Sequence, residues 1–323
     1  MAPEWTQSNP IARQALYIAR TCKYARMRRE ARRDARRAPD PARILPVRFV
    51  VGCGRSGTTI LSHSLGTHPD AKFLYEPYHS WERIDTRADM TAFHSRPENK
   101  KIFFDAEDFE PEHSTRFRRL IASAGDPATH SCVVEKTPIN ACRIGWIERL
   151  EPDARYVHIV RNGISVARSV ERLVLHPTYK MAFRPHYDQW WGERNIKWET
   201  LSREGPIRGY TPGEPELLTD HAQRGAYEWI ASLGELDRAR DTLGDRLLEI
   251  TLTELTTDPR GTLGKLTDHL GLEPHDGWLA TAASGIRAEA PPPEQQLTLP
   301  PAMLACFNAY QERFGFDGRA VLA

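Results

Sequence analysis

The chain has 323 residues, 44 of them Lys or Arg and 43 Asp or Glu, so its formal net charge is +1 at pH 7; 40% of its residues are hydrophobic. This length can bury a large core, as one big domain or two small ones. The near-neutral charge argues against a general affinity for nucleic acid, and the lack of a run of about eighteen apolar residues argues against a membrane-spanning helix.

The N-terminal region carries arginines at Arg13, Arg20 and Arg26, which interrupt any apolar stretch of the kind a secretory signal contains. The five cysteines are odd in number and form no C-x-x-C pair. We therefore expect reduced thiols and a cytoplasmic protein. Cys53 could be a reactive thiol, but a small residue in a tight turn is the simpler interpretation.

Residues 1–43 are rich in alanine and arginine and predict a basic helical arm. Apolar residues recur at helical spacing, namely Ile11, Ala15, Leu16, Ala19 and Cys22. Two prolines, Pro39 and Pro41, end the segment. Two interpretations stay open. The arm is a solvated helix that lies on the domain or on a second subunit of a homodimer, or it binds an acidic surface, membrane headgroups or an anionic substrate.

Residues 44–323 predict one α/β domain with a central parallel sheet and helices on both faces, because short apolar strands alternate with helical segments. The expected strands are 47–51, 132–135, 156–160 and 247–250. The expected helices are 58–66, 144–150, 164–175 and 222–242.

Residues 176–220 fit this scheme badly, because they are rich in aromatic residues, proline and glycine and show no clean period. An acceptor-binding or lid insertion has this composition. A satellite hydrophobic core is the alternative.

The most informative stretch is G-C-G-R-S-G-T-T, residues 52–59, directly after the first strand. Its spacing matches the phosphate loop G-x-x-x-x-G-K-[ST], but Thr58 replaces the lysine. The backbone N–H groups still form an anion site, whereas the charge that grips the outer phosphates of ATP or GTP is missing. The strand 156–160 ends in Arg161 rather than in a magnesium-binding aspartate. We therefore expect a nucleotide with a less densely charged 5′ group and no metal.

Five further stretches add to this loop, and together they resemble the sulfotransferases that use 3′-phosphoadenosine 5′-phosphosulfate (PAPS). Residues 55–59 with T-H-P-D (67–70) and Y-E-P (75–77) resemble the 5′-phosphosulfate loop, and Y-V-H-I-V-R-N-G-I-S-V-A-R-S (156–169) resembles the 3′-phosphate segment. E-K-T-P (135–138) is similar to a segment in the carbohydrate and tyrosyl-protein branches of the sulfotransferases. Residues 247–272 look like the strand, loop and helix near the C-terminal end of these enzymes.

The resemblance implies a P-loop nucleotide-hydrolase-like fold and assigns the donor site. The 5′-phosphosulfate would be held by Arg55, Ser56, Gly57, Thr58 and Thr59. Arg161 and Ser169 would hold the 3′-phosphate, and adenosine 3′,5′-bisphosphate (PAP) would be the product. The R-K-G-x-x-G element of the cytosolic aryl branch is absent, and residues 284–287 are the candidate replacement.

For catalysis the resemblance points to Glu76 as the general base and Lys136 as the cation near the departing group. Alternatives stay open for both: a surface glutamate, and an ion pair of Lys136 with Glu135 or Glu76. His79 is the reserve candidate for the base. His63 lies in the first expected helix and His68 in the turn after it, so we expect both to be packing or capping residues.

The function expected from these residues is transfer of a sulfuryl group from PAPS to a hydroxyl of a carbohydrate, lipid-linked or natural-product acceptor. The arginine-, alanine- and proline-rich composition suggests a bacterium with a GC-rich genome. Two other classes stay open: a P-loop kinase-like nucleotide enzyme and a non-catalytic nucleotide-binding scaffold.

Overall fold

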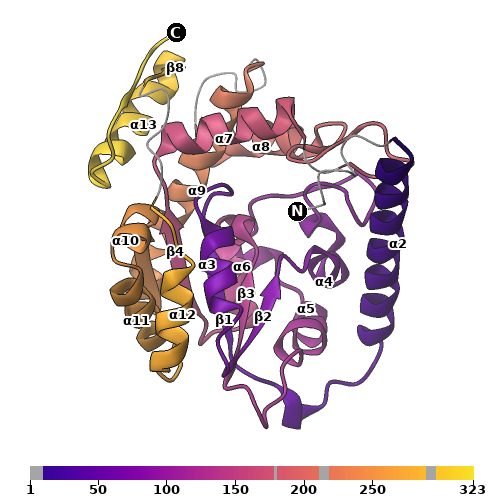
Figure 1. Cartoon of the computed structure of the whole chain (residues 1–323). Helices are drawn as coiled ribbons and strands as arrows, with labels where there is room; N and C mark the ends of the chain where they lie inside the picture. Colours follow the sequence, from indigo (N-terminus) through magenta and orange to yellow (C-terminus); the bar gives the residue numbers. More distant parts are fainter. Residues whose placement is uncertain (1–9, 178–179, 211–217, 289–295) are drawn as a thin grey trace.

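A parallel sheet of five strands forms the centre of the molecule in a computed structural model, which describes residues 10–177, 180–210, 218–288 and 296–323 (Figure 1). The strand order is β2-β3-β1-β4-β7, and every neighbouring pair is parallel. The strands are β1 (Val47–Val51), β2 (Ala71–Tyr75), β3 (Cys132–Lys136), β4 (Arg155–Val160) and β7 (Leu247–Thr251). The predicted α/β class is confirmed.

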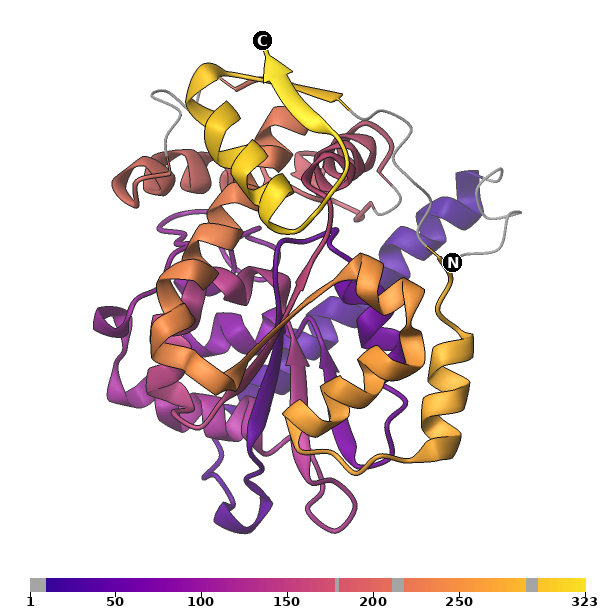
Figure 2. The ribbon, with the colours of Figure 1, turned by 90° about the vertical axis from the view of Figure 1, so that its left-hand side faces the viewer.

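Helices cover both faces of the sheet because β1 is apolar on both of its sides. Phe49 points to one face, where its ring stacks on Tyr156 with centroids 5.5 Å apart, whereas Val50 belongs to the core on the opposite face. Figure 2 shows the orange helices α10 (Leu252–Thr257), α11 (Pro259–Leu270) and α12 (Asp276–Ser284) on one side of the sheet. The other side carries α4 (Tyr78–Ile84), α5 (Pro111–Phe117), α6 (Ile144–Leu150) and α9 (His221–Leu243).

The four predicted strands and four predicted helices are present, including α3 (Thr58–Leu65) and α7 (Gly163–Leu175). Strand β2 was not predicted, because it is a partly exposed edge strand interrupted by Lys72 and lacks a continuous apolar run. The C-terminal part adds α13 (Pro301–Arg313) and a two-stranded parallel pair, β8 (Gln296–Leu299) with β9 (Arg319–Leu322).

The expectation that residues 176–220 hold no regular element is wrong for part of the segment; residues 178–179 and 211–217 lie outside the described chain. Helix α8 (Ile196–Ile207) follows a small antiparallel pair, β5 (Tyr187–Asp188) with β6 (Gly192–Glu193). Trp198 and Leu201 of α8 are buried in the core that α7 and α9 share. Gly205 and Pro206 lie in its last turn and hide the helical pattern in the sequence.

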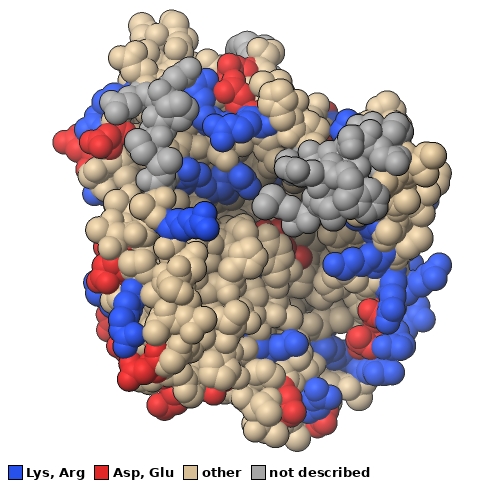
Figure 3. All heavy atoms as spheres, in the orientation of Figure 1, with Lys and Arg blue, Asp and Glu red and all other residues tan. Residues whose placement is uncertain are grey.

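The basic arm forms helix α2 (Pro10–Asp34), which runs along one side of the molecule in Figure 1. Tyr24 packs edge-on against Phe93 at 4.7 Å, Ala31 is buried, and Arg28 Nη1 donates to the carbonyl oxygen of His94 at 3.3 Å. Lys and Arg side chains gather on this side in Figure 3. The described part of the arm therefore lies on its own domain. Within the described residues, no helix is both long and apolar enough to cross a membrane.

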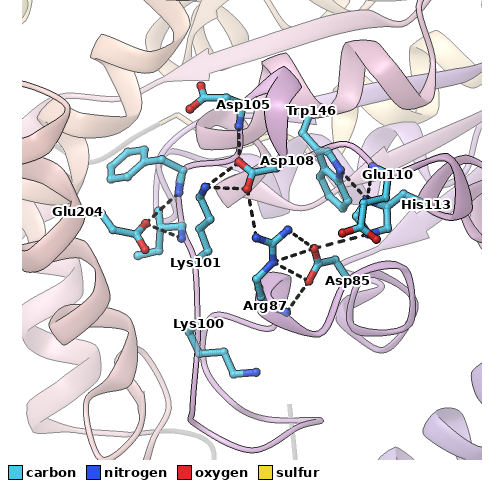
Figure 4. Close-up of polar contacts among 12 residues, drawn as sticks. Asp85, Arg87, Lys100, Lys101, Asp105, Asp108, Glu110, His113, Trp146 and Glu204 are labelled. Atoms are coloured by element: carbon cyan, nitrogen blue, oxygen red, sulfur yellow. Dashed lines mark hydrogen bonds and ion pairs between the residues drawn. The ribbon is translucent and has the colours of Figure 1, made fainter.

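A network of charged side chains fixes the chain that follows α4 (Figure 4). Arg87 pairs with Asp85 at 2.7 Å and with Asp108 at 3.2 Å, and Lys101 pairs with Asp108 at 2.7 Å. Glu204 of α8 accepts the backbone N–H of Ile102 at 2.9 Å. This network joins the segment that follows α4 to helix α8, so it fixes the position of these two elements relative to each other.

Candidate active site

The loop of residues 52–59 joins the carboxyl end of β1 to the first turn of α3, where parallel strands of this architecture bind their ligands. Gly57 has φ 93°, and a Cβ there would lie 2.6 Å from Leu252 Cδ1. A Cβ on Gly52, φ 140°, would lie 2.6 Å from the carbonyl oxygen of Ile159. Both positions therefore require glycine, and the loop is packed tightly against β4 and the start of α10.

Ser56 is 1% exposed, and its Oγ has no hydrogen-bond partner among the described residues. A buried hydroxyl group without a hydrogen-bond partner is unusual in proteins. The position of this hydroxyl in the loop fits a hydrogen bond to an oxygen atom of a ligand. Thr58 is also buried, whereas Thr59 is exposed at the start of α3.

Arg55, Arg161 and Ser169 come together from three elements. Arg55 Nε donates to Ser169 Oγ of α7 at 2.9 Å, and Arg161 Nη1, after β4, donates to the carbonyl oxygen of Arg55 at 3.1 Å. Burial and the neighbouring Arg161 both lower the pKa of Arg55. Two guanidinium groups beside a ring of backbone N–H groups form a strongly anion-attracting surface.

Arg55 and Arg161 border a cavity of about 460 Å³, a size that suits a nucleotide. It is lined by Arg55, Gly57, Thr58, Thr59, Ile60, Arg161, Leu252, Thr256, Gly285, Arg287 and Ala288. The segment after α12 thus brings a third guanidinium, that of Arg287, to the cavity. Of residues 284–287, the candidate replacement for the missing second element, Gly285 and Arg287 line this cavity.

Glu76 and Lys136 meet at the carboxyl ends of β2 and β3, which are neighbours in register. Lys136 Nζ donates to Glu76 Oε1 at 2.5 Å, and Glu76 N donates to the carbonyl oxygen of Lys136 at 2.8 Å. The Lys136 side chain is fully buried, with its Nζ 3.9 Å from the ring centre of Tyr75, whereas 28% of the Glu76 side chain is exposed. A solvent-facing carboxylate therefore lies in front of a buried ammonium group.

Glu135, the other possible partner of Lys136, points to the opposite side of β3. Its carboxylate accepts from Trp81 Nε1 at 2.9 Å and Asn140 Nδ2 at 3.0 Å, and from the hydroxyl of Thr137. Burial raises its pKa to about 7, although these three hydrogen bonds oppose the shift. The ion pair that the sequence left open is therefore the one with Glu76.

The three histidines weighed as bases lie in other environments. His79 borders a second cavity, of about 520 Å³, together with Met27 and Glu30 of α2. Burial lowers the pKa of His79. His63 is exposed on α3, and His68 is buried in the turn that follows it.

A family model described as "Sulfotransferase family" matches residues 46–211, which is more than half of the chain. The chain belongs to the sulfotransferase family. It is 27% identical over 132 residues to human protein-tyrosine sulfotransferase 1, covering 39% of this chain and 34% of that protein. It is 26% identical over 140 residues to nodulation protein NoeE of Sinorhizobium fredii, covering 38% of this chain and 30% of that protein. The chain thus aligns with about a third of the length of each curated relative.

A solved structure, mouse sulfotransferase SULT7A1 complexed with PAP, aligns with 75% of this chain and 64% of its own, at 15% identity and a TM-score of 0.39.

One element of this sulfotransferase site was missed in the sequence. Trp190, from the aromatic segment, packs on the phosphate loop so closely that a Cβ on Gly54 would lie 2.3 Å from its ring. Trp190 Nε1 donates to Glu228 Oε2 at 3.0 Å, and Lys197 Nζ lies 3.9 Å from the ring centre and 2.7 Å from Glu228 Oε1. The aromatic segment therefore packs against the phosphate loop and supports it. The only sequence signal was the adjacent pair of tryptophans at 190 and 191.

Cys53, beside this contact, is buried, and burial raises the pKa of its thiol well above the usual value. A low-pKa thiolate in the loop is not what the structure provides.

Proposed function

We propose that this protein is a PAPS-dependent O-sulfotransferase that moves a sulfuryl group to a hydroxyl of a carbohydrate, lipid-linked or natural-product acceptor. The observation that carries the proposal is the convergence of Arg55, Arg161 and Ser169 beside a phosphate loop that has Thr58 in place of lysine. PAPS carries two separate anionic groups, and this arrangement offers two separate sets of donors.

The loop and the N-terminus of α3 would hold the 5′-phosphosulfate through backbone N–H groups and the hydroxyls of Ser56, Thr58 and Thr59. Arg161 and Ser169 would hold the 3′-phosphate, and Arg287 adds positive charge to the same cavity. The donor set consists of guanidinium, hydroxyl and amide groups, so the proposed binding of PAPS and PAP uses no metal ion.

Glu76 is the proposed general base. Its ion pair with Lys136 requires the carboxylate to be ionised, which is the form that accepts a proton from the acceptor hydroxyl. The acceptor oxygen would form a bond to sulfur while the bond from sulfur to the bridging phosphate oxygen breaks, so the proton goes to Glu76 and the electron pair to the leaving phosphate.

Lys136 acts in this proposal through Glu76, because its ammonium is fully buried behind that carboxylate. The positive charge nearest the leaving phosphate then comes from Arg55 and the loop amides. Tyr75, the last residue of β2, is 52% exposed beside Glu76, which supports an acceptor with an apolar part.

A cytoplasmic location belongs to the same proposal and is supported by the five cysteines, all of which are unpaired.

Calorimetric titration with PAP in EDTA tests the donor site, with ATP and magnesium as the competing ligand pair. The wild-type protein should bind PAP without metal, and Arg161→Ala should weaken that binding by tenfold or more. Arg29→Ala, an exposed arginine of α2, is the matched control and should bind PAP normally. Tighter, magnesium-dependent binding of ATP would overturn the proposal in favour of a kinase-like enzyme. If PAP binds, a panel of hydroxyl acceptors with PAPS then tests transfer, and binding without turnover on any acceptor would favour a non-catalytic scaffold.

A further inference from the structure

Two histidines and an aspartate meet at the edge of the sheet opposite the active site. His68 and Asp70 lie in the turn between α3 and β2, and His275 immediately precedes α12. Asp70 precedes the first residue of β2, whereas Glu76 follows the last. Five strand residues separate them, so their Cα atoms lie about 20 Å apart. This cluster is therefore distinct from the site that contains Glu76.

The three side chains have the spacing of metal ligands. One ligand atom from each of His68, Asp70 and His275 lies within 4.8 Å of the other two. His275 Nε2 is 2.6 Å from Asp70 Oδ2, and the two histidine rings are 5.4 Å apart between centroids. Ligand atoms around a tetrahedral zinc lie about 3–3.5 Å apart, given zinc–nitrogen and zinc–oxygen distances of about 2.0–2.2 Å, so small side-chain movements would suffice.

The turn that carries two of the ligands is well fixed. His68 N donates to the carbonyl oxygen of Leu65 at 3.1 Å, and the carbonyl oxygen of Asp70 accepts from Ser131 N at 2.8 Å. Pro69 lies between the two ligands and restricts the backbone. These side chains therefore start from a rigid frame, which lowers the entropy cost of binding.

The hydrogen bonds of His68 place its unprotonated ring nitrogen, Nδ1, at the cluster. Its Nε2 lies 3.2 Å from the carbonyl oxygen of Glu273, which can only accept, so the proton is on Nε2. Nδ1 is then unprotonated, and its one lone pair accepts a 3.2 Å hydrogen bond from the backbone N–H of Asp70. A metal bound at Nδ1 would replace this hydrogen bond. A histidine ligand that donates its other N–H to a backbone carbonyl is the common arrangement around protein-bound metals.

We propose that His68 Nδ1, Asp70 Oδ2 and His275 Nε2 form a binding site for a divalent transition metal, with zinc as the best match and water as the fourth ligand. Two imidazoles and one carboxylate are ligands that zinc takes, whereas magnesium and calcium prefer sites made of oxygen alone. Trp278 packs edge-on against His68 at 4.5 Å and forms an apolar wall of the site.

The metal would join the turn after α3 to the start of α12. The far end of α12 leads to Gly285 and Arg287, which border the donor cavity. The role is therefore structural: the metal fixes one end of a helix whose other end reaches the active site. It takes no part in the proposed sulfuryl transfer.

The test is titration of metal-stripped protein with zinc chloride, followed by calorimetry, and with cobalt chloride, followed by visible absorption. The wild-type protein should bind one zinc per chain, and cobalt should give the strong absorption of a tetrahedral complex. His275→Ala and Asp70→Asn should weaken zinc binding at least tenfold. His63→Ala, an exposed histidine on the neighbouring helix, is the matched control and should bind as the wild type does.

Thermal unfolding gives a second readout that is independent of PAPS chemistry. Zinc should raise the Tm of the wild-type and His63→Ala proteins by several degrees and leave the Tm of His275→Ala unchanged. Magnesium and calcium should not raise the Tm of any of these proteins. His275 has 43% of its side chain exposed, so its replacement should not prevent folding. Absence of stoichiometric binding, or equal binding by His275→Ala, would mean that Asp70 and His275 form only an ion pair. PAP binding in EDTA reports on the donor site, so failure of one proposal leaves the other testable.

Discussion

Lys136 is fully buried and places its Nζ 2.5 Å from Oε1 of Glu76, the residue that follows the neighbouring strand. Glu76 itself has φ 45°, a conformation that residues other than glycine adopt rarely. The strained backbone and the buried partner together hold the carboxylate at the carboxyl edge of the sheet. Strain of this kind is common where a side chain must be aimed at a ligand.

Replacement of Glu76 by Gln should lower kcat by roughly a hundredfold or more, because the amide cannot accept the acceptor proton. PAP affinity, measured by calorimetry, should stay within a few-fold of the wild-type value. His79→Gln is the control and should keep most of the activity, since His79 borders the cavity beneath α2. A Glu76→Gln enzyme with normal turnover would remove Glu76 from the role of base.

Lys136→Met should lower kcat by tenfold or more while leaving PAP affinity nearly unchanged, because the ammonium acts on Glu76. The methionine has a similar volume and removes a buried charge together with its desolvation cost, so the fold should be retained. Steady-state kinetics and urea denaturation of the same preparation separate the two effects. A large loss of PAP affinity instead would place Lys136 at the donor.

Ser169→Ala should weaken PAP binding by about tenfold or more, which corresponds to about 1.5 kcal/mol or more for one hydrogen bond to a charged phosphate. The serine hydroxyl accepts from Arg55 Nε, so its loss also frees that guanidinium to move. Ser131→Ala, an exposed serine directly before β3, is the comparison variant and should bind PAP as the wild type does. Equal affinities for the Ser169→Ala and wild-type proteins would show that the 3′-phosphate lies elsewhere.

Gly54→Ala should weaken PAP binding, because the added methyl would lie 2.3 Å from the Trp190 ring and displace the loop. The ring cannot turn away easily, since its Nε1 bonds to Glu228. The double variant with Trp190→Phe should recover part of the affinity, because the smaller ring leaves room. No recovery in the double variant would mean that Gly54 is needed for its backbone alone.

Glu135 should make the fold less stable as the pH rises from about 4.5 to about 7, because burial raises its pKa from 4.5 to about 7 in the folded state. In this window the folded protein keeps a proton that the unfolded chain loses. The contribution amounts to about 2–4 kcal/mol between pH 4.5 and pH 8. Urea denaturation at pH 5 and pH 8 should show a smaller difference for Glu135→Gln than for the wild type, and an equal difference would contradict the assignment.

The sequence predicted those features in which adjacent residues carry the information. The apolar run at 47–51 and the glycines of the loop are local signals, and they led to the strand and the turn. The threonine at position 58 is a local signal as well, and it led to the type of ligand that we propose. Arg161 was proposed through the resemblance of residues 156–169 to the 3′-phosphate segment, which is also a pattern of adjacent residues.

Features that depend on contacts between distant segments were not predictable. Nothing in the sequence near Gly54 shows that Trp190 packs on it. Nothing in E-K-T-P shows which glutamate pairs with Lys136. The partner is determined by the pleat of β3, because consecutive side chains of a strand point to opposite faces of the sheet. Helix α8 was missed because its glycine and proline are typical of loops, whereas burial of Trp198 and Leu201 stabilises it.

The donor cavity joins loop residues near position 55 to Leu252, Arg287 and their neighbours, more than 190 residues further along the chain. On the ribosome, β1 to β4 can therefore pair before the wall formed by α10 and the end of α12 has been synthesised. Until then Gly57 lacks the leucine that packs on it and the anion site is open on one side. The newly made chain acquires its ligand affinity only when its last third has folded, so a ligand present in the cell stabilises the finished protein and not its precursors.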